Sequence, residues 1–282
     1  MGRWIKRVLI FFGILFSLGM LGTFLARFPI GDRIAVVKVE GVITDPQAVV
    51  SKMEKARLDP SVKALVLRVE SPGGSVGASQ EIYREVERFR QSGKPVVVSM
   101  GNVAASGGYY ISAPANVIYA NPGTITGSIG VIIQHTDVQQ LLEKLGIKTT
   151  AIKTGKFKDT LSPFRELTPE ERQYLQNLVE DAYSQFIEAI LRYRKGKVQE
   201  DILRQIADGR ILTGKQAKEL GLVDELGDLQ DAIQKAKELA RVPQARVFYM
   251  EDKKGFLKRM LEGKVPSLQQ VWSPLMIYYM ME

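Results

Sequence analysis

The sequence contains no cysteine and only one histidine, His135. The lack of cysteine excludes thiol nucleophiles, disulfide bridges and thiolate metal sites, and a single imidazole cannot build a histidine-rich metal centre. An oxidising compartment is compatible with this composition, because a stray thiol is a liability there. We therefore expect neither a thiolate nor a histidine-rich metal site.

The chain also lacks the patterns that bind nucleic acid. Its net charge of +8 comes from 39 Lys and Arg against 31 Asp and Glu, spread along the sequence, with one concentration at residues 253–264. No RNA- or DNA-binding motif accompanies these charges, and no aromatic residues alternate with them as in a base-stacking platform. A solvated face is the ordinary interpretation of such a basic run, and an anionic lipid surface is the partner that it favours.

The longest apolar segment covers residues 8–26 and contains no charged side chain. At about 1.5 Å per helical residue it is long enough to cross a hydrocarbon core of roughly 30 Å, so we predict one membrane span. A cleaved signal peptide is the alternative, but the run is long for one and its last residues lack a small-x-small cleavage pattern. Three basic residues precede the span: Arg3, Lys6 and Arg7. They predict a cytoplasmic N-terminus, which places the part of the chain after the span outside the cytoplasmic (inner) membrane.

Apolar, β-branched runs alternate with segments of helical periodicity over residues 30–250, between the anchor (residues 1–29) and a basic and apolar tail (residues 251–282). This alternation is typical of an α/β fold with a mainly parallel sheet and helices on both faces. Strands are expected at 34–39, 64–69, 96–100, 117–120, 149–152 and 246–249. Helices are expected at 46–56, 76–91, 106–113, 138–145, 168–193, 199–207, 214–220 and 229–240.

Ser106 is the serine whose surroundings point to chemistry. It lies in GNVAASGGYY (Gly101–Tyr110), after the apolar run Pro95–Met100 and at the start of a predicted helix. A strand that turns tightly into a helix displays such a hydroxyl at a helix N-terminus, where the backbone dipole favours developing negative charge. A plain N-cap is the competing interpretation, and the more common one for a serine in this position.

A glycine-rich turn follows an earlier predicted strand, in the segment SPGGS (Ser71–Ser75). Its adjacent glycines let the backbone approach a ligand closely, although a simple strand-to-helix turn needs the same residues. Beside an exposed serine, the N–H groups of Gly74 and Gly107 would form a two-donor oxyanion hole.

A serine hydroxyl also needs a base. His135 lies at the start of a predicted helix, where a surface or capping role is usual, and a Ser-His-Asp triad would depend on it alone. A neutral lysine is the other candidate. The segment TGKFKD (Thr154–Asp159) offers Lys156 and Lys158, and the chemistry of the sequence alone does not choose between them.

Five motifs, in the same order, resemble those of the signal peptide peptidase A family. The resemblance runs from about residue 34 to residue 249, and five motifs in order are far more specific than any one of them. Members of that family are membrane-bound serine endopeptidases of the ClpP/crotonase-type fold. The motifs are SPGGS (71–75), GNVAASGGYYIS (101–112), TGSIG (126–130), TGKFKD (154–159) with SPFRELTPEE (162–171), and ADGRILTGKQAKELGLVDELG (207–227).

The resemblance implies a Ser-Lys dyad. Carried over by position, it makes Ser106 the nucleophile and Lys158 the general base, with Ser128 holding the lysine amine and Gly74 and Gly107 forming the oxyanion hole. It implies no cofactor. The chain resembles the short, single-copy form of the family, in which a homo-oligomeric ring is expected to pair the serine of one protomer with the lysine of its neighbour.

The substrates implied by the resemblance are remnant signal peptides in the bilayer and other apolar peptides, cleaved by a domain on the extracytoplasmic side. Two other functions compete with this one. A crotonase-type acyl-CoA enzyme uses the same fold and paired N–H groups, and a non-catalytic membrane scaffold would keep these residues as turns and caps. Neither requires the serine among small residues together with the lysine motif.

Overall fold

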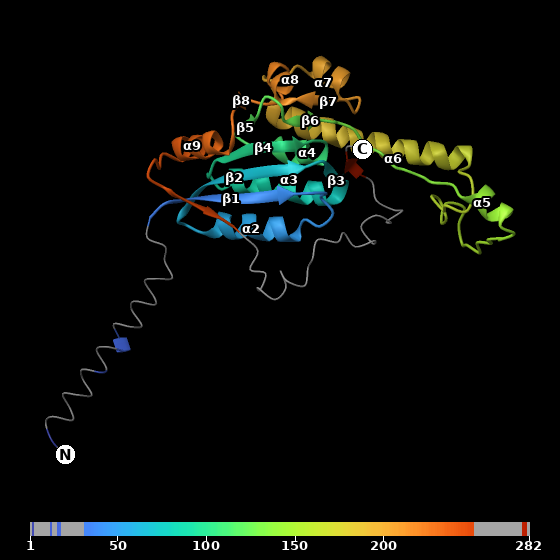
Figure 1. Cartoon of the computed structure of the whole chain (residues 1–282), viewed down its shortest axis with the longest axis horizontal. Helices are drawn as coiled ribbons and strands as arrows, with labels where there is room; N and C mark the ends of the chain where they lie inside the picture. The colour runs from blue at the N-terminus through green and yellow to red at the C-terminus, as the bar shows by residue number, and fades with distance from the viewer. Residues whose placement is uncertain (1, 3–11, 13–15, 18–30, 251–277, 281–282) are drawn as a thin grey trace.

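The computed structural model describes residues 31–250 and 278–280, together with residues 2, 12, 16 and 17 (Figure 1). Apart from residues 12, 16 and 17, the span predicted at residues 8–26 lies outside this range, as does most of the tail predicted at residues 251–282. None of the helices in the described part of the chain is long and apolar enough to cross a membrane.

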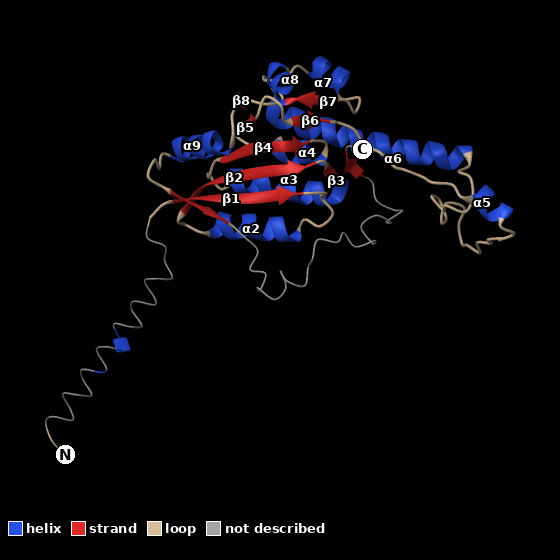
Figure 2. Ribbon diagram, in the orientation of Figure 1, coloured by secondary structure: helices blue, strands red, loops and turns tan. Residues whose placement is uncertain are grey.

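A mainly parallel sheet forms the centre of the molecule (Figure 2). All of its strand pairs are parallel except the antiparallel pair at one edge, β6 with β7. In spatial order the strands are β7 (Ile211–Thr213), β6 (Ile125–Gly127), β4 (Val96–Ala104), β2 (Val62–Ser71), β1 (Arg33–Glu40) and β9 (Arg246–Tyr249); β5 (Val117–Ala120) pairs with β4 and with β8 (Glu225–Leu226). The predicted sheet is therefore confirmed.

Helices cover both faces of this sheet, as predicted. Neighbouring side chains on a strand point to opposite faces, so Val37 of β1 packs in one core with α2 (Gln47–Leu58) and α3 (Val76–Gln91), whereas Val36 packs in a second core with α9 (Leu229–Ala240). Because both faces are buried, the strands are apolar along nearly their whole length rather than alternating. This accounts for the continuous β-branched runs in the sequence.

The longest helix, α6 (Pro169–Arg194), extends beyond the body of the protein (Figure 1). Thr168 and Glu171 form a capping box at its start, and Pro169 occupies the first turn. Its buried apolar residues all lie in the second half, between Ala182 and Ile190, so only that half packs on the body. The outer half carries a projection that we call the arm (residues 134–175), which includes α5 (Gln139–Lys144).

Most predicted elements lie where the sequence placed them, but one prediction is wrong. Residues 149–152 form neither a strand nor a helix, and Ile152 is fully exposed. An apolar run becomes a strand only where a neighbouring strand can accept and donate its hydrogen bonds, and no described strand pairs with this part of the arm. The remaining elements are β3 (Gly73–Ser75), α4 (Gly107–Ser112), α7 (Glu200–Ile206), α8 (Gly214–Glu219) and β10 (Tyr278–Met280).

Candidate active site

Ser106 lies at the junction between β4 and α4 in a strained backbone conformation, with φ 52° and ψ −117°. For a residue with a Cβ, such a conformation costs about 1–3 kcal/mol and persists only where the surroundings hold it. Its N–H donates to the carbonyl of Gly127 (2.8 Å), and its carbonyl accepts from Tyr110 (2.8 Å). The Oγ atom is buried and has no hydrogen-bond partner among the described residues. An uncommitted hydroxyl on a strained turn is what a nucleophile requires.

The two glycines predicted to form the oxyanion hole lie together beside Ser106. A Cβ built on Gly107 would be 3.2 Å from the backbone nitrogen of Gly74. Gly107 is the first residue of α4, where N–H groups have no acceptor within the helix. A Cβ on Gly74 would be 2.1 Å from the carbonyl oxygen of Ile43, so only glycine fits there. The two glycines predicted as oxyanion donors are therefore close neighbours in the structure.

A second buried hydroxyl lies at this site, that of Ser79 on α3, and sequence analysis did not identify it. Its Oγ is buried without a partner among the described residues, and it would be 2.6 Å from a Cβ on Gly107. A serine in the first turn of an amphipathic helix carries no motif that would identify it.

Ser128 is joined to the Ser106 turn through the backbone, because Gly127, its neighbour, accepts the hydrogen bond from Ser106. Ser128 has a positive φ of 49°, and its own N–H donates to the carbonyl of Arg210 (2.8 Å). It lines a cleft of about 600 Å³ between the sheet edge and α6, whose walls include the apolar Val131 and Val179. The cleft provides room for a side chain beside Ser128.

An extended segment of the chain pairs with β3. Residues 278–280 (β10) run antiparallel to it, with Tyr279 opposite Gly74 in the register. The same segment also lies against α3 and α4. The edge of the strand that carries the candidate oxyanion donor is thus able to bind a polypeptide in extended form.

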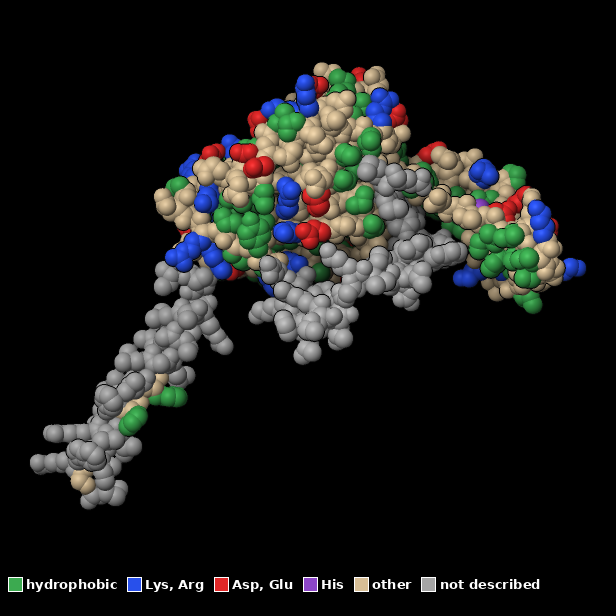
Figure 3. All heavy atoms as spheres, in the orientation of Figure 1, with side chains coloured by type: hydrophobic (Ala, Val, Ile, Leu, Met, Phe, Trp, Pro, Cys, Tyr) green, Lys and Arg blue, Asp and Glu red, His purple; other side chains and the backbone are tan. Residues whose placement is uncertain are grey.

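The structure does not bring Lys158 to Ser106 within one chain. Lys158 is exposed in the arm, at the outer end of α6, whereas Ser106 is buried at the end of β4 (Figure 1). His135 also lies in the arm (Figure 3), so it offers no base at Ser106 of the same chain either. In the described part of the chain, no three histidine, aspartate or glutamate side chains are grouped so that they could hold a metal ion.

The ion pairs of the arm distinguish Lys158 from its neighbouring lysines. Lys153 pairs with Asp159, and Lys156 pairs with Glu170 at 2.5 Å. Lys158 has no ion pair among the described residues. Among the described residues, Lys158 is therefore the one lysine of residues 153–158 whose ammonium group no carboxylate holds in place.

The chain is similar to known peptidases. Its residues 88–243 match the model of peptidase family S49. Protease 4 of Salmonella typhi is 42% identical over 248 residues, which cover 85% of this chain and 40% of that protein. A Synechocystis sp. protein named provisionally as a protease is 44% identical over 234 residues (82% of this chain, 83% of that one). An Enterococcus faecium protein named provisionally as signal peptide peptidase SppA is 36% identical over 251 residues (84% and 72%).

Proposed function

The chain belongs to peptidase family S49 and is a serine peptidase, and on that premise we propose that it cleaves apolar peptides internally with Ser106 as nucleophile and Lys158 as general base. The fold proposed for its catalytic domain is of the ClpP/crotonase type. The observation that carries the proposed peptidase function is the antiparallel pairing of residues 278–280 (β10) with β3.

In the proposed mechanism, neutral Lys158 accepts the Ser106 proton while Oγ attacks the scissile carbonyl carbon. The N–H groups of Gly74 and Gly107 stabilise the resulting oxyanion. The C–N bond then breaks as Lys158 gives the proton to the leaving amine. A water molecule, deprotonated by Lys158, attacks the acyl-enzyme ester, and Lys158 returns the proton to Ser106 Oγ as the ester C–O bond breaks. Ser128 orients the lysine amine.

The strand pairing of β10 supports a peptide substrate. A polypeptide that adds to an exposed strand edge gains main-chain hydrogen bonds that do not depend on its side chains. A peptide bound to Gly73–Ser75 in this way passes the paired amides of Gly74 and Gly107. An acyl-CoA substrate has no backbone to pair with this edge, so the strand addition favours the peptidase over the acyl-CoA enzyme.

The proposed active site is shared between copies of the chain in a homo-oligomeric ring, with the arm of one protomer supplying Lys158 to Ser106 of the next. Two observations support this arrangement: the separation of the two residues within one chain, and the exposure of large apolar side chains along the arm (Figure 3). Exposed apolar surface of this extent indicates an interface. The side chains, with their exposed fractions, are Leu141 (57%), Leu145 (64%), Ile147 (49%), Ile152 (100%), Phe157 (38%) and Phe164 (46%).

We place the protein in the cytoplasmic membrane, anchored by residues 8–26, with its N-terminus in the cytoplasm and its catalytic domain on the extracytoplasmic side. The bilayer is then a partner, and the proposed substrates are remnant signal peptides, in keeping with the name of the Enterococcus relative. Nucleic acid is not among the proposed partners.

The test uses the full-length chain in detergent micelles, assayed with an apolar fluorogenic peptide and, separately, with short acyl-CoA thioesters. We expect peptide cleavage that is insensitive to chelators, and no thioester turnover. Thioester turnover without peptide cleavage would replace the proposal with the acyl-CoA enzyme, and no turnover of either substrate would favour the scaffold.

Removal of residues 251–282 is expected to raise kcat/KM for a peptide several-fold. The apparent affinity for substrate falls in proportion to the fraction of molecules whose β3 edge is unoccupied. The deletion removes β10, which pairs with that edge. Initial rates at low substrate concentration measure the effect. A synthetic peptide with the sequence of residues 275–282 should inhibit the shortened protein, and equal kcat/KM values for the two forms would contradict the expectation.

A further inference from the structure

We infer that Arg165 is a positioning residue for the proposed base: it fixes the loop that carries Lys158 and keeps the Asp159 carboxylate occupied, away from the lysine amine. This inference rests on the proposed function of Lys158.

The loop from residue 153 to residue 162 contains no helix or strand, only successive turns. Short backbone hydrogen bonds hold each turn, such as Lys158 N–H to Gly155 O (3.1 Å) and Ser162 N–H to Asp159 O (3.0 Å). These bonds fix the shape of each turn but do not attach the loop to the rest of the protein. Its position therefore depends on side-chain contacts.

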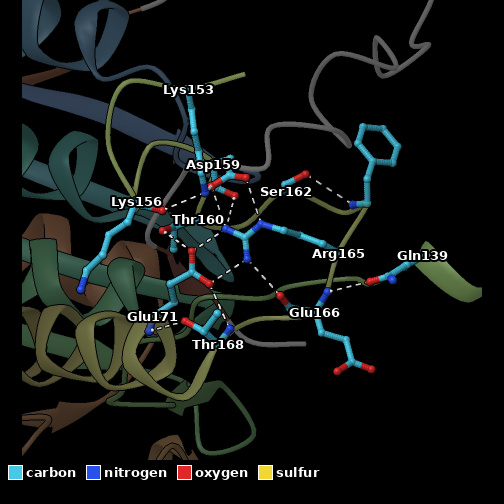
Figure 4. Close-up of polar contacts among 11 residues, drawn as sticks. Gln139, Lys153, Lys156, Asp159, Thr160, Ser162, Arg165, Glu166, Thr168 and Glu171 are labelled. Carbon is cyan, nitrogen blue, oxygen red and sulfur yellow. Dashed lines mark hydrogen bonds and ion pairs between the residues drawn. The ribbon is translucent and has the colours of Figure 1, made fainter. Parts of the chain in front are cut away.

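Arg165 supplies several of those contacts (Figure 4), beside the Lys156–Glu170 ion pair and the stacking of Phe157 on Tyr174. Its Nε and Nη2 atoms donate to the two carboxylate oxygens of Asp159 (2.9 and 2.8 Å), and Nη2 also donates to the Asp159 carbonyl (3.2 Å). On its other side, Nη1 and Nη2 donate to the two oxygens of Glu171 (2.8 and 2.5 Å). One planar guanidinium thus makes two bidentate pairs, a geometry that an ammonium group cannot reproduce.

Glu171 connects this cluster to a rigid element. Its carboxylate accepts from the Thr168 N–H (3.0 Å), and its own N–H donates to Thr168 Oγ1 (3.2 Å), which closes the capping box of α6. It also accepts from Thr160 Oγ1 (3.1 Å), and its side chain is only 3% exposed. Since the other end of α6 is packed in the core, Arg165 fastens the residue next to Lys158 to the body of the protein.

The second part of the role is electrostatic. Arg165 and Lys153 hold the pKa of the Asp159 carboxyl well below its usual range, so this carboxyl is ionised at neutral pH. The other charged groups of this cluster are Lys156 paired with Glu170, Glu171 paired with Arg165, and the flanking Glu166 and Arg172. A carboxylate released beside Lys158 would stabilise its ammonium form and oppose the proton loss that a base requires.

The test compares full-length Arg165→Ala with wild type over a range of pH. We expect kcat to fall about 10- to 100-fold, because a base displaced by about 1 Å loses that much, while KM stays within about twofold. The acid limb of kcat/KM should move to higher pH by about 0.5–1 unit, the size of an exposed charge pair at close range. Arg204→Ala is the matched control, since it breaks an exposed ion pair with Glu200 on α7, and should change neither quantity.

Two further variants separate position from charge. In Arg165→Ala with Asp159→Asn, the carboxylate next to Lys158 in the chain is removed, so the acid limb should return to the wild-type pH while kcat remains low. Arg165→Lys keeps the positive charge but lacks the planar guanidinium that makes the two bidentate pairs. It should lower kcat while the acid limb of the kcat/KM profile moves little. This variant replaces Arg165→Ala in the test if Arg165→Ala does not assemble.

A folded, assembled Arg165→Ala protein with the wild-type kcat and pH profile would overturn the inference, and so would a limb that stays shifted in the double variant. Failure of the proposed function is a different result: an active Lys158→Met enzyme. An inactive Lys158→Met enzyme beside a wild-type-like Arg165→Ala would reject the role of Arg165 alone.

Discussion

Replacing Ser106 with alanine is expected to lower kcat for an apolar peptide by about four to six orders of magnitude, the loss that follows removal of a serine nucleophile elsewhere. Its Oγ is the atom that forms the acyl-enzyme bond in the proposed mechanism. Ser79, the other buried hydroxyl without a partner, lies on α3 beside Gly107, and a different backbone position cannot take over an attack that depends on the turn between β4 and α4.

The matched control is Ser112→Ala, which removes a buried serine hydroxyl from α4, the helix that begins directly after Ser106. Ser112 Oγ donates to the Gly108 carbonyl (2.7 Å), so this change should cost about 1 kcal/mol of unfolding free energy and leave kcat within a few-fold. Single-turnover assays with active-site titration measure both variants. Peptide cleavage by Ser106→Ala at more than about one hundredth of the wild-type rate would exclude Ser106 as the nucleophile.

The strained backbone at Ser106 leads us to expect that Ser106→Gly is more stable than Ser106→Ala. The positive φ of Ser106 is strained for any residue with a Cβ but ordinary for glycine, so Ser106→Gly should raise the free energy of unfolding by about 1 kcal/mol relative to Ser106→Ala. Thermal melting of the two inactive variants tests this directly. Equal melting temperatures would mean that the turn is not strained.

Replacing Lys158 with methionine is expected to lower kcat to a similar extent, about four orders of magnitude or more, because the serine then has no base. Methionine preserves the length and flexibility of the side chain but cannot accept a proton. Lys156→Met is the matched control, two residues away: Lys156 is an exposed lysine paired with Glu170, and its loss should change kcat by less than about threefold. Equal losses in the two variants would contradict the choice of Lys158.

Mixing the two inactive proteins tests whether the site is shared. In a mixed ring assembled from equal amounts of Ser106→Ala and Lys158→Met subunits, about a quarter of the junctions would combine an intact serine with an intact neighbouring lysine. We therefore expect activity up to about a quarter of the wild-type value after subunit exchange. Separately purified rings mixed without exchange provide the control. No recovery despite demonstrated exchange would place both residues of a working site in one chain.

The long elements of this fold could be predicted because each contains enough residues to show a period. The observed bounds of α3 (Val76–Gln91) and α9 (Leu229–Ala240) coincide with the prediction. Strands of two or three residues, such as β6 and β7, show no period at all and form only because a neighbouring strand is present. The prediction of a strand at residues 149–152 was wrong for the opposite reason: the segment has the apolar residues of a strand, but no described strand lies beside it to pair with.

Some features of the candidate site could likewise be recognised from the sequence, and others depend on tertiary structure. The strand-to-helix turn at Ser106 and the glycine pair near Gly74 could be recognised from short motifs, because a tight turn restricts which residues fit. Arg165 lies in a motif that was read from the sequence, but its role depends on Asp159 and Glu171 lying on opposite sides of one guanidinium. That arrangement is a product of tertiary structure, as is the strand formed by residues 278–280.

The separation of Ser106 from the arm that carries Lys158 has a consequence for when the enzyme works. If two copies must meet before a hydroxyl has a base, activity rises more steeply than in proportion to the amount of protein, and a newly made single copy is a harmless precursor. Confinement of the copies to one surface would raise their effective concentration and favour that meeting. If the chain is anchored in a membrane, as we propose, crowding of its copies in the membrane plane would then raise its activity without an activating cleavage or ligand.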